Sequence, residues 1–304
     1  LDAEGVQCWG RDNEGQTDVP ALSNPVLVSA GGNHTCAVDD AGVQCWGGND
    51  DGESDVPDRF VTSGDYFDVG VVTALNGASA FTISQWVRAP SLSGDKVFFA
   101  IVTDANNRLL IEFYATDIIV GVSNGGNAYQ RFCYNGGAFN TFTWYHIAVV
   151  FDGSIVTEAD RVILYADGVP QPSTSTTGTF PATTPTFVTN TFVGSYDSGL
   201  YTFDGKMSNT AIWDSALTED EVLEVYGGGD PPDLSNLDTA PPPINWWRLG
   251  EESTFSTNWT ITDQIGSNDG TSANMGIGAR VGDAPDSINN GLTINMESVD
   301  RVAP

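Results

Sequence analysis

The sequence predicts an all-β protein, and three observations support this prediction. Glycine (34 residues) and proline (15) are frequent, and Thr, Ser, Asn and Asp fill the segments around them, as is typical of a turn-rich β protein. Runs of β-branched and aromatic residues, such as 96–102 and 143–151, are separated by turn signals such as Asp167-Gly168. No helical pattern lies between these runs, so the chain is expected to form a sandwich or a barrel.

The charge balance excludes several classes of partner. Lys and Arg number 11 against 40 Asp and Glu, which gives a net charge of -29. Binding to a phosphate backbone or to an anionic membrane requires basic patches, so neither nucleic acid nor a lipid surface is an expected partner. No stretch has the roughly 20 apolar residues that span a bilayer, so no membrane insertion is expected.

The cysteines indicate an oxidising compartment. Cys8, Cys36, Cys45 and Cys133 are an even number, but few for 304 residues, which fits one or two disulfides. The chain has two histidines and no CxxC motif, so a zinc site is not expected. We predict an extracellular protein, secreted or exposed on a cell or virion surface.

Residues 1–58 contain an internal repeat. GVQCWG occurs at 5–10 and again at 42–47, and AGGNHTCAV lies between the copies at 30–38. This pattern resembles the regulator-of-chromosome-condensation repeat of bacterial secreted proteins, a family of multi-bladed propellers. Two partial copies are too few for a ring, so we expect a propeller-type stub. The resemblance implies neighbouring strands for Cys36 and Cys45 and hence a disulfide between them; Cys8 is free, paired with Cys133, or paired between molecules.

Residues 59–226 carry most of the predicted strands. The segments that define this region are DYFDVG (65–70), FTISQWVRA (81–89), TWYHIAVVFDGS (143–154), RVILYADGVP (161–170) and FDGKMSNTAIWDSALTEDEVLEVY (203–226). In order and spacing they resemble the laminin-G-like, pentraxin-like and concanavalin A-like family, which implies a jelly-roll β-sandwich. A short closing helix is predicted after Thr218, because Thr218 and Glu221 form a capping box and a glycine run at 227–229 ends it. Leu223 and Tyr226 are expected to face the sandwich.

The C-terminal part is predicted to consist of a linker and a tail. Residues 227–245 are rich in Gly, Pro and Asp, as in a linker. Residues 246–304 form a Trp-containing tail or arm, with INWWRLGEE and TITDQIGSNDGTSANM at its start. It resembles tails of laminin-G-like surface proteins of marine phages and bacteria. Trp246, Trp247 and Trp259 either pack back on the sandwich or mediate assembly.

Catalytic patterns are scarce. His146 lies in an alternating apolar strand and His34 in the repeat, so structural roles are expected for both. Glu112 is the one strand-interior Glu with apolar neighbours, and no ExDxE strand of the kind seen in related hydrolases occurs. We therefore expect no enzyme, with a polysaccharide-active hydrolase as the remote alternative.

Calcium is the favoured cofactor. It takes hard oxygen ligands, and the resemblance implies a site at the sandwich rim. Asp68, Asp204 and Asp214 are the expected ligands, because the first and last strands of this fold are expected to pair. The alternative is that Asp204 and Asp214 only make turns.

Sugar recognition would use exposed aromatic rings together with polar side chains. The loop-like stretches supply five candidates, for each of which ordinary packing is the alternative: Tyr129, Phe132, Tyr134, Tyr196 and Tyr201. We therefore predict a glycan-binding adhesion or recognition module. The alternative function is that of a subunit of an extracellular filament or virion fibre, which would self-assemble through its terminal segments.

Overall fold

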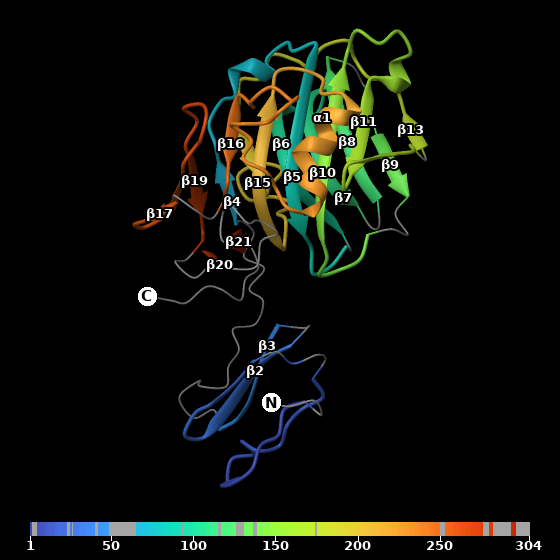
Figure 1. Cartoon of the computed structure of the whole chain (residues 1–304). Coiled ribbons are helices and arrows are strands. Elements are labelled where there is room, and N and C mark those ends of the chain that lie inside the picture. The colour runs from blue at the N-terminus through green and yellow to red at the C-terminus, as the bar shows by residue number, and fades with distance from the viewer. Residues whose placement is uncertain are drawn as a thin grey trace. The chain divides into compact units, whose positions relative to one another are not determined.

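The computed structural model describes most of the chain (Figure 1). The described residues are 1, 5–22, 25, 27–39, 42–48, 65–92, 94–114, 117–125, 131–135, 139–173, 175–249, 253–275, 280–281 and 293–295. The chain divides into two compact units, Leu1–Val61 and Thr62–Pro304. None of the described helices is long and apolar enough to cross a membrane.

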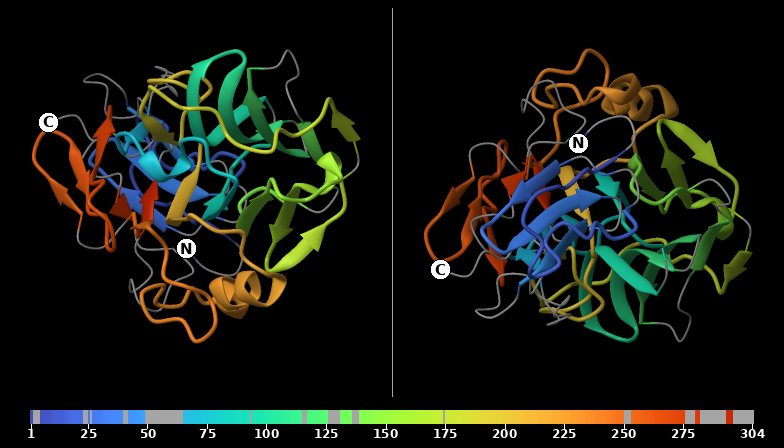
Figure 2. Two further views of the ribbon diagram at one scale, coloured as in Figure 1. Left: turned by 90° about the horizontal axis from the view of Figure 1, so that it is seen from above. Right: turned by 90° about the horizontal axis from the view of Figure 1, so that it is seen from below.

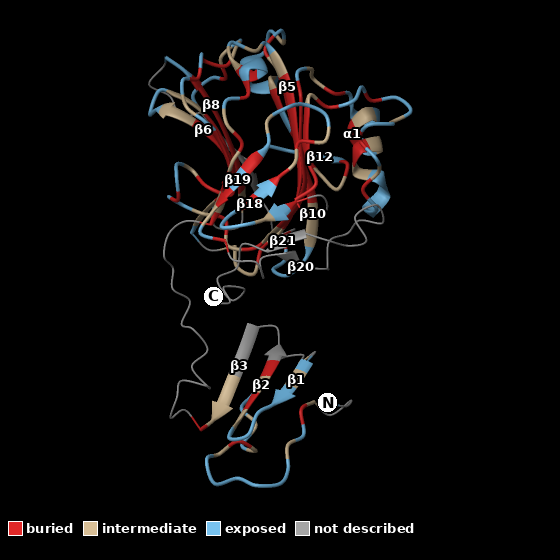
Figure 3. Cartoon of the chain, turned by 90° about the vertical axis from the view of Figure 1, so that its left-hand side faces the viewer, coloured by how far each residue is buried: buried red, intermediate tan, exposed pale blue. Residues whose placement is uncertain are grey.

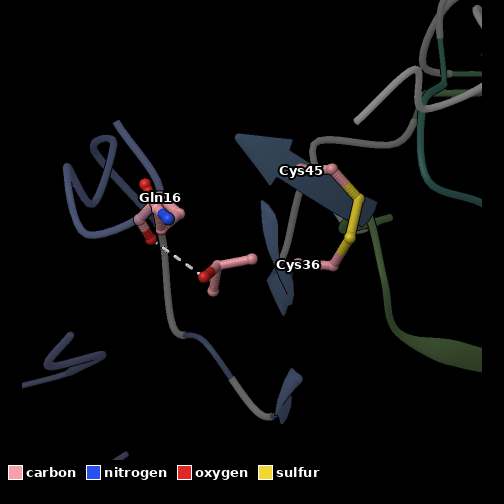
Figure 4. Close-up of a disulfide and its surroundings, with 4 residues drawn as sticks. Gln16, Cys36 and Cys45 are labelled. Carbon is pink, nitrogen blue, oxygen red and sulfur yellow. Dashed lines mark hydrogen bonds between the residues drawn. A yellow bond between two sulfur atoms is a disulfide. The ribbon is translucent and has the colours of Figure 1, made fainter. Parts of the chain in front are cut away.

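The N-terminal unit contains a small antiparallel sheet in the order β1 (Leu27–Ala30), β2 (His34–Asp39) and β3 (Gly42–Gly47). Cys36 and Cys45 lie opposite each other on β2 and β3 and form a disulfide, which confirms the predicted pairing (Figure 4). The buried Thr35 hydroxyl donates to the carbonyl oxygen of Gln16 at 2.9 Å, which ties the preceding segment to the sheet. Cys8 is free and half-buried.

The second unit is a jelly-roll β-sandwich, as predicted. In the described part of the chain, one sheet has eight strands. In spatial order they are β12 (Val169–Gln171), β11 (Val162–Ala166), β10 (Trp144–Asp152), β5 (Ala80–Arg88), β15 (Lys206–Trp213), β21 (Thr293–Asn295) and β20 (Arg280–Val281), and β16 (Asn245–Trp247) also pairs with β15.

The opposing sheet has ten strands within the same described ranges. Their order is β13 (Ser175–Thr177), β9 (Arg131–Asn135), β8 (Asp117–Asn124), β7 (Asn107–Tyr114), β6 (Asp95–Asp104), β14 (Thr191–Val193), β4 (Tyr66–Asp68), β19 (Gly270–Ala273), β18 (Trp259–Ile261) and β17 (Thr254–Phe255). Single 3-10 turns lie at η1 (Thr73–Leu75), η2 (Glu158–Asp160) and η3 (Gly227–Gly229).

The hydrophobic core lies between the two sheets, where the facing strands are buried (Figure 3). Successive strand residues point to opposite faces, so every second side chain enters the core. On β7 and β10 these are Leu109, Ile111, Phe113, Ile147, Val149 and Phe151. Each large apolar side chain buried this way stabilises the fold by about 1.5–3 kcal/mol.

Helix α1 (Glu219–Tyr226) covers the outer face of the eight-stranded sheet (Figure 2). It begins at the predicted capping box, in which Thr218 and Glu221 satisfy each other's backbone N–H groups, and ends at Gly227 with φ 64°. Val222 and Val225 are its buried residues. Tyr226 faces the sandwich as expected and stacks on Trp86 of β5, with ring centroids 5.7 Å apart. Leu223 is 51% exposed, and only the end of its side chain approaches Gly168 between β11 and β12.

The segment predicted as a linker is packed against this helix. Leu234 and Ala240 are buried in one cluster with Val222 and Trp213. The Glu224 carboxylate accepts hydrogen bonds from the backbone N–H groups of residues 238–240. The Trp213 indole donates to the carbonyl oxygen of Pro241 at 2.7 Å. Residues 230–243 therefore form a strap across the sheet.

The beginning of the predicted tail belongs to the sandwich. β16 pairs with β15, and β19 pairs with β4, so the segment contributes strands to both sheets. Trp246, Trp247 and Trp259 are all buried, which decides the open alternative in favour of packing on the sandwich.

The Asp263 carboxylate holds the beginning of the tail in its conformation through hydrogen bonds. Its carboxylate accepts from the side chain of Asn245 and from the backbone N–H groups of Trp246, Ile265, Gly266 and Asn268. The Asn268 amide in turn donates to the carbonyl oxygens of Val69 and Val71, which follow β4. The DQIGSNDG motif is thus a loop that joins the tail to the first strand of the sandwich.

Candidate functional site

A groove lies on the outer face of the ten-stranded sheet. Strand alternation turns the side chains of Arg108, Leu110, Glu112 and Tyr114 away from the core, so they form a row along β7. Asp95 at the start of β6, Ile119 on β8, and Tyr196 and Tyr201 complete the described lining. The cavity measures about 440 Å³. We call it the β7 groove.

Residues 195–202, part of the connection between β14 and β15, form one wall of the groove and are anchored by hydrogen bonds. The hydroxyl of the fully buried Ser195 donates to the Leu200 carbonyl at 3.1 Å and accepts from the Gly199 N–H at 2.9 Å. The Val97 N–H donates to the Tyr201 carbonyl at 3.0 Å, which fixes the loop to β6. Ser198 and Tyr201 have φ values of 36° and 49°. Such left-handed residues are costly and persist only where the surroundings hold them, as they often do at functional sites.

The tyrosine rings of the groove combine packing with exposure. Tyr196 and Tyr201 meet edge to face, with centroids 5.8 Å apart and an interplanar angle of 88°. Arg108 Nη1 donates to the Tyr196 hydroxyl at 3.2 Å, so Tyr196 is held in place. Tyr201 is 57% exposed and Tyr114 44% exposed, which leaves two ring surfaces available to a ligand.

Polar groups of both kinds converge in the groove. Glu112 is 7% exposed and supplies acceptor oxygens from the floor, and Asp95 adds a second carboxylate. Arg108 supplies guanidinium donors. A groove with ring surfaces, donors and acceptors can hold a hydroxyl-rich ligand by stacking and hydrogen bonding together.

The structure brings some of the predicted sugar-binding residues together. Tyr196 and Tyr201 line the β7 groove. Phe132 and Tyr134 lie on β9, where their backbones pair with Val120 and Ile118; their side chains, and all of Tyr129, fall outside the described residues.

Sequence reasoning did not assign Arg108, Tyr114 or Asp95 to a site, and weighed Glu112 only as a remote catalytic group. The alternation along β7 marks Arg108, Glu112 and Tyr114 as one face. The wall that makes this face a groove is formed by Tyr196 and Tyr201, which lie about 90 positions later in the sequence.

The predicted calcium ligands have separate surroundings. The first and last strands do not pair, contrary to expectation, because β4 lies in the ten-stranded sheet and β15 in the other. Asp68 accepts from the Gly70 N–H at 2.9 Å and from the Asn190 amide at 2.8 Å. Asp204 lies 3.6 Å from the Lys96 ammonium, and Asp214 is exposed at the end of β15. Within the described ranges, no three His, Cys, Asp or Glu side chains are grouped so that they could hold a metal ion.

His146 is fully buried on the other outer face, away from the groove. Its Nε2 lies 2.7 Å from the Ser84 hydroxyl, and its ring contacts Trp86 and Tyr226. Burial lowers the pKa of His146 to about 3, so the ring is neutral at physiological pH. The Ser84–His146 pair has no exposed edge for a substrate.

Comparisons with known proteins agree with the fold. The family model of the concanavalin A-like lectin/glucanases superfamily matches residues 61–223, more than half of the chain. The model of the regulator of chromosome condensation repeat matches residues 26–53. The resemblances of the N-terminal repeat and of the sandwich are thereby confirmed, and that of the C-terminal tail stays a prediction. A search of curated proteins finds no match.

Several solved structures are similar to this chain. The native heptameric SAP-like pentraxin from Limulus polyphemus is 17% identical, with a TM-score of 0.44, over 69% of this chain and 90% of the pentraxin. The Ruminococcus gnavus IT-sialidase CBM40 bound to alpha2,3 sialyllactose is 16% identical, with a TM-score of 0.45, over 54% of this chain and 94% of that module. Domains LG4-5 of the mouse laminin alpha1 chain are 14% identical, with a TM-score of 0.36, over 52% of this chain and 45% of theirs.

Proposed function

Since the chain belongs to the concanavalin A-like lectin/glucanases superfamily, we propose that it is an extracellular recognition module that binds glycans in the β7 groove. One observation carries the proposal: an anchored loop and an outward-facing strand row place two exposed tyrosines beside a buried carboxylate and a guanidinium. The disulfide supports the extracellular location, because such bonds persist in oxidising compartments.

Binding would rest on two kinds of contact. Tyr201 and Tyr114 offer faces on which the apolar side of a sugar ring can stack. Glu112 and Asp95 accept hydrogen bonds from hydroxyl groups, and Arg108 donates to hydroxyl or ring oxygens. Because Ser195 already fixes the loop, little ordering entropy is lost when a ligand binds.

A glycan array probed with the full chain tests the proposal, followed by titration calorimetry on the strongest hit. Tyr201→Ala should weaken binding at least about tenfold, whereas Tyr201→Phe should retain most of it because the ring is kept. Trp9→Ala is the matched control, since Trp9 is 84% exposed and lies in the other unit. Equal glycan affinities of Tyr201→Ala and the parent chain would show that the glycan binds outside the β7 groove.

The same titration with calcium and with a chelator tests the calcium prediction. A metal held by Asp68, Asp204 or Asp214 would make glycan affinity or thermal stability depend on calcium. Identical curves in both buffers would remove calcium from the proposal without affecting the groove. Size-exclusion chromatography of the same samples tests the alternative of a self-assembling subunit.

Hydrolysis is the second candidate, because Asp95 and Glu112 are two carboxyl side chains in one groove, and glycosidases act with a pair of carboxyl groups. Product analysis after incubation with the array's best ligand separates the two activities. Release of sugar that Glu112→Gln abolishes would identify an enzyme; unchanged ligand would support a binding module.

A further inference from the structure

We infer that Cys8 is a covalent attachment site for small thiols that carry carboxylate or amide groups, as cysteine-containing peptides do. The site lies in the N-terminal unit, so it goes beyond the proposed glycan binding and does not depend on it. Three observations carry the inference: a cavity beside the thiol, a buried donor without a partner in the cavity wall, and the charge of the lining.

A cavity of about 470 Å³ lies beside Cys8. Cys8 is half-buried and is the free cysteine of the described residues, so its sulfur is available for reaction. The rest of the wall comes from the segment around Gln16, from β1 and from the start of β2. A cavity of this size lies within the range of roughly 300–1,000 Å³ that is usual for small-molecule sites.

Gln16 supplies a hydrogen-bond donor that is unused in the described part of the chain. Its side chain is buried, at 7% exposed, and forms part of the cavity wall. Two bonds fix it: Oε1 accepts from the Glu14 N–H at 2.9 Å, and the backbone carbonyl accepts from the Thr35 hydroxyl at 2.9 Å. The buried Nε2 has no partner there. Such donors are rare because they cost folding free energy, and a ligand carbonyl or carboxylate oxygen would satisfy this one.

The charge of the cavity favours an anionic group. Arg11 is the only charged side chain among the described lining residues, in a chain with 40 acidic and 11 basic residues. Its exposed guanidinium presents paired donors that match a carboxylate. Asp12 and Glu14 are exposed and do not belong to the described lining. A carboxylate or amide close to the ligand's sulfur would therefore find donors beside Cys8.

The disulfide of the N-terminal unit lies away from this cavity. Successive strand residues point to opposite faces, so Cys36 and Thr35 lie on different sides of β2. Thr35 lines the cavity, and Figure 4 shows Gln16 and the Cys36–Cys45 disulfide on opposite sides of this strand. Exchange between Cys8 and this disulfide would require the sheet to open, whereas an external disulfide can reach Cys8 through the cavity.

The attachment is a thiol–disulfide exchange. The Cys8 thiolate attacks one sulfur of the ligand's disulfide, and a bond forms between the two sulfurs while the ligand's own S–S bond breaks. The other half leaves as a thiolate with the electron pair of that bond, and it takes up the proton that Cys8 has lost to solvent. One disulfide replaces another, so no further oxidant is needed.

Mass spectrometry of the full chain is the first test, with oxidised glutathione and with bis(2-hydroxyethyl) disulfide, which lacks carboxylate and amide groups. Each rate is divided by the rate of the urea-unfolded chain, which removes the intrinsic reactivity of the reagent. We expect one glutathione half on Cys8, formed at least about tenfold faster by this measure than the hydroxyethyl adduct. Equal normalised rates, or a peptide map that places the adduct on Cys133 alone, would overturn the inference.

Variants of the wall are the second test. Arg11→Gln should slow the reaction with oxidised glutathione at least about fivefold and leave the hydroxyethyl reaction unchanged, while Arg11→Lys should retain more of the rate because the charge is kept. Gln16→Leu should act in the same selective way. The matched control, Lys206→Gln, removes the same charge from the other unit and should change neither rate.

Three outcomes of this second test contradict the inference. An equal fall with both reagents would show that the variants alter access to Cys8, and an equal fall in the Lys206→Gln control would assign the effect to the overall charge. A chain linked through Cys8 to Cys133 or to a second chain, seen on a non-reducing gel in place of the adduct, would give Cys8 a protein partner. Peptide mapping of Cys36–Cys45 and circular dichroism verify the fold of each variant.

Discussion

The outer face of the eight-stranded sheet is covered, whereas that of the ten-stranded sheet is open at the β7 groove. On the covered face, α1 and the strap bury Trp213, Tyr165 and the Ser84–His146 pair. On the open face, a short anchored loop leaves Tyr114 and Tyr201 exposed beside Glu112. Under the proposed function, this difference divides the roles: residues of the covered face would contribute to stability, and residues of the groove would contribute to binding.

Trp213→Ala should have the largest effect. Trp213 is 1% exposed and donates to the strap, so its removal creates a cavity and frees the Pro241 carbonyl. We expect a loss of about 3–5 kcal/mol in the free energy of unfolding. Urea denaturation followed by circular dichroism measures it. A loss below about 1 kcal/mol in the free energy of unfolding would show that the packing of Trp213 under the strap contributes little to stability.

Acid should destabilise the covered face through His146. The pKa of this histidine falls from 6.5 to about 3 on burial, so between these values the unfolded chain holds a proton that the folded chain lacks. The contribution of His146 to the free energy of unfolding is therefore complete above about pH 6.5. It falls by about 1.4 kcal/mol per pH unit from there down to about pH 3.

Urea titrations at pH 7, 6, 5 and 4 measure this dependence. Because many carboxylates also titrate in this range, the His146→Asn variant is the reference. It should have a shallower dependence than the parent chain, and parallel curves would show that His146 contributes nothing.

Asp263→Asn should have an intermediate effect. The substitution keeps the shape but places amide donors opposite the backbone N–H groups that Asp263 now satisfies. We expect a loss of about 1–3 kcal/mol, the cost of leaving buried donors without acceptors. Thermal unfolding measures it, with the exposed Asp238→Asn as control. If Asp263→Asn and Asp238→Asn melt at the same temperature, the hydrogen bonds of Asp263 are not what holds the tail on the sandwich.

Tyr201→Ala should have the smallest effect on stability. Its side chain is 57% exposed, so the free energy of unfolding should change by less than about 0.5 kcal/mol while glycan affinity falls. If Tyr201→Ala unfolds the protein as Trp213→Ala does, the distinction between the faces fails.

Ser195→Ala should affect both stability and binding. It should lower the free energy of unfolding by about 1 kcal/mol and also weaken binding, because the loop loses its anchor.

Much of the fold could be predicted from local sequence signals. The alternation in β5, β7 and β10, the capping box at Thr218 and the motifs of the sandwich all correspond to elements found. The strap and the tail could not be predicted, because their composition is that of a linker. Four of its residues are buried, Pro231, Leu234, Ala240 and Pro243, and no periodicity reveals them.

The candidate site was predictable only in part. Loop-like surroundings pointed to Tyr196 and Tyr201, which do line the groove. Glu112 and Arg108 could be placed on one face of a strand, but a loop far along the chain decides that this face becomes a groove. Tertiary contacts of that range leave no local pattern in a sequence.

The anchored loop 195–202 also bears on how binding would proceed in time. Ser198 and Tyr201 already hold their left-handed backbone, and Ser195 and Val97 fix the loop on both sides. If this loop keeps its conformation when a ligand binds, association should be a single fast step. Differences between sugars would then reside in how long each remains bound, which is the dissociation rate.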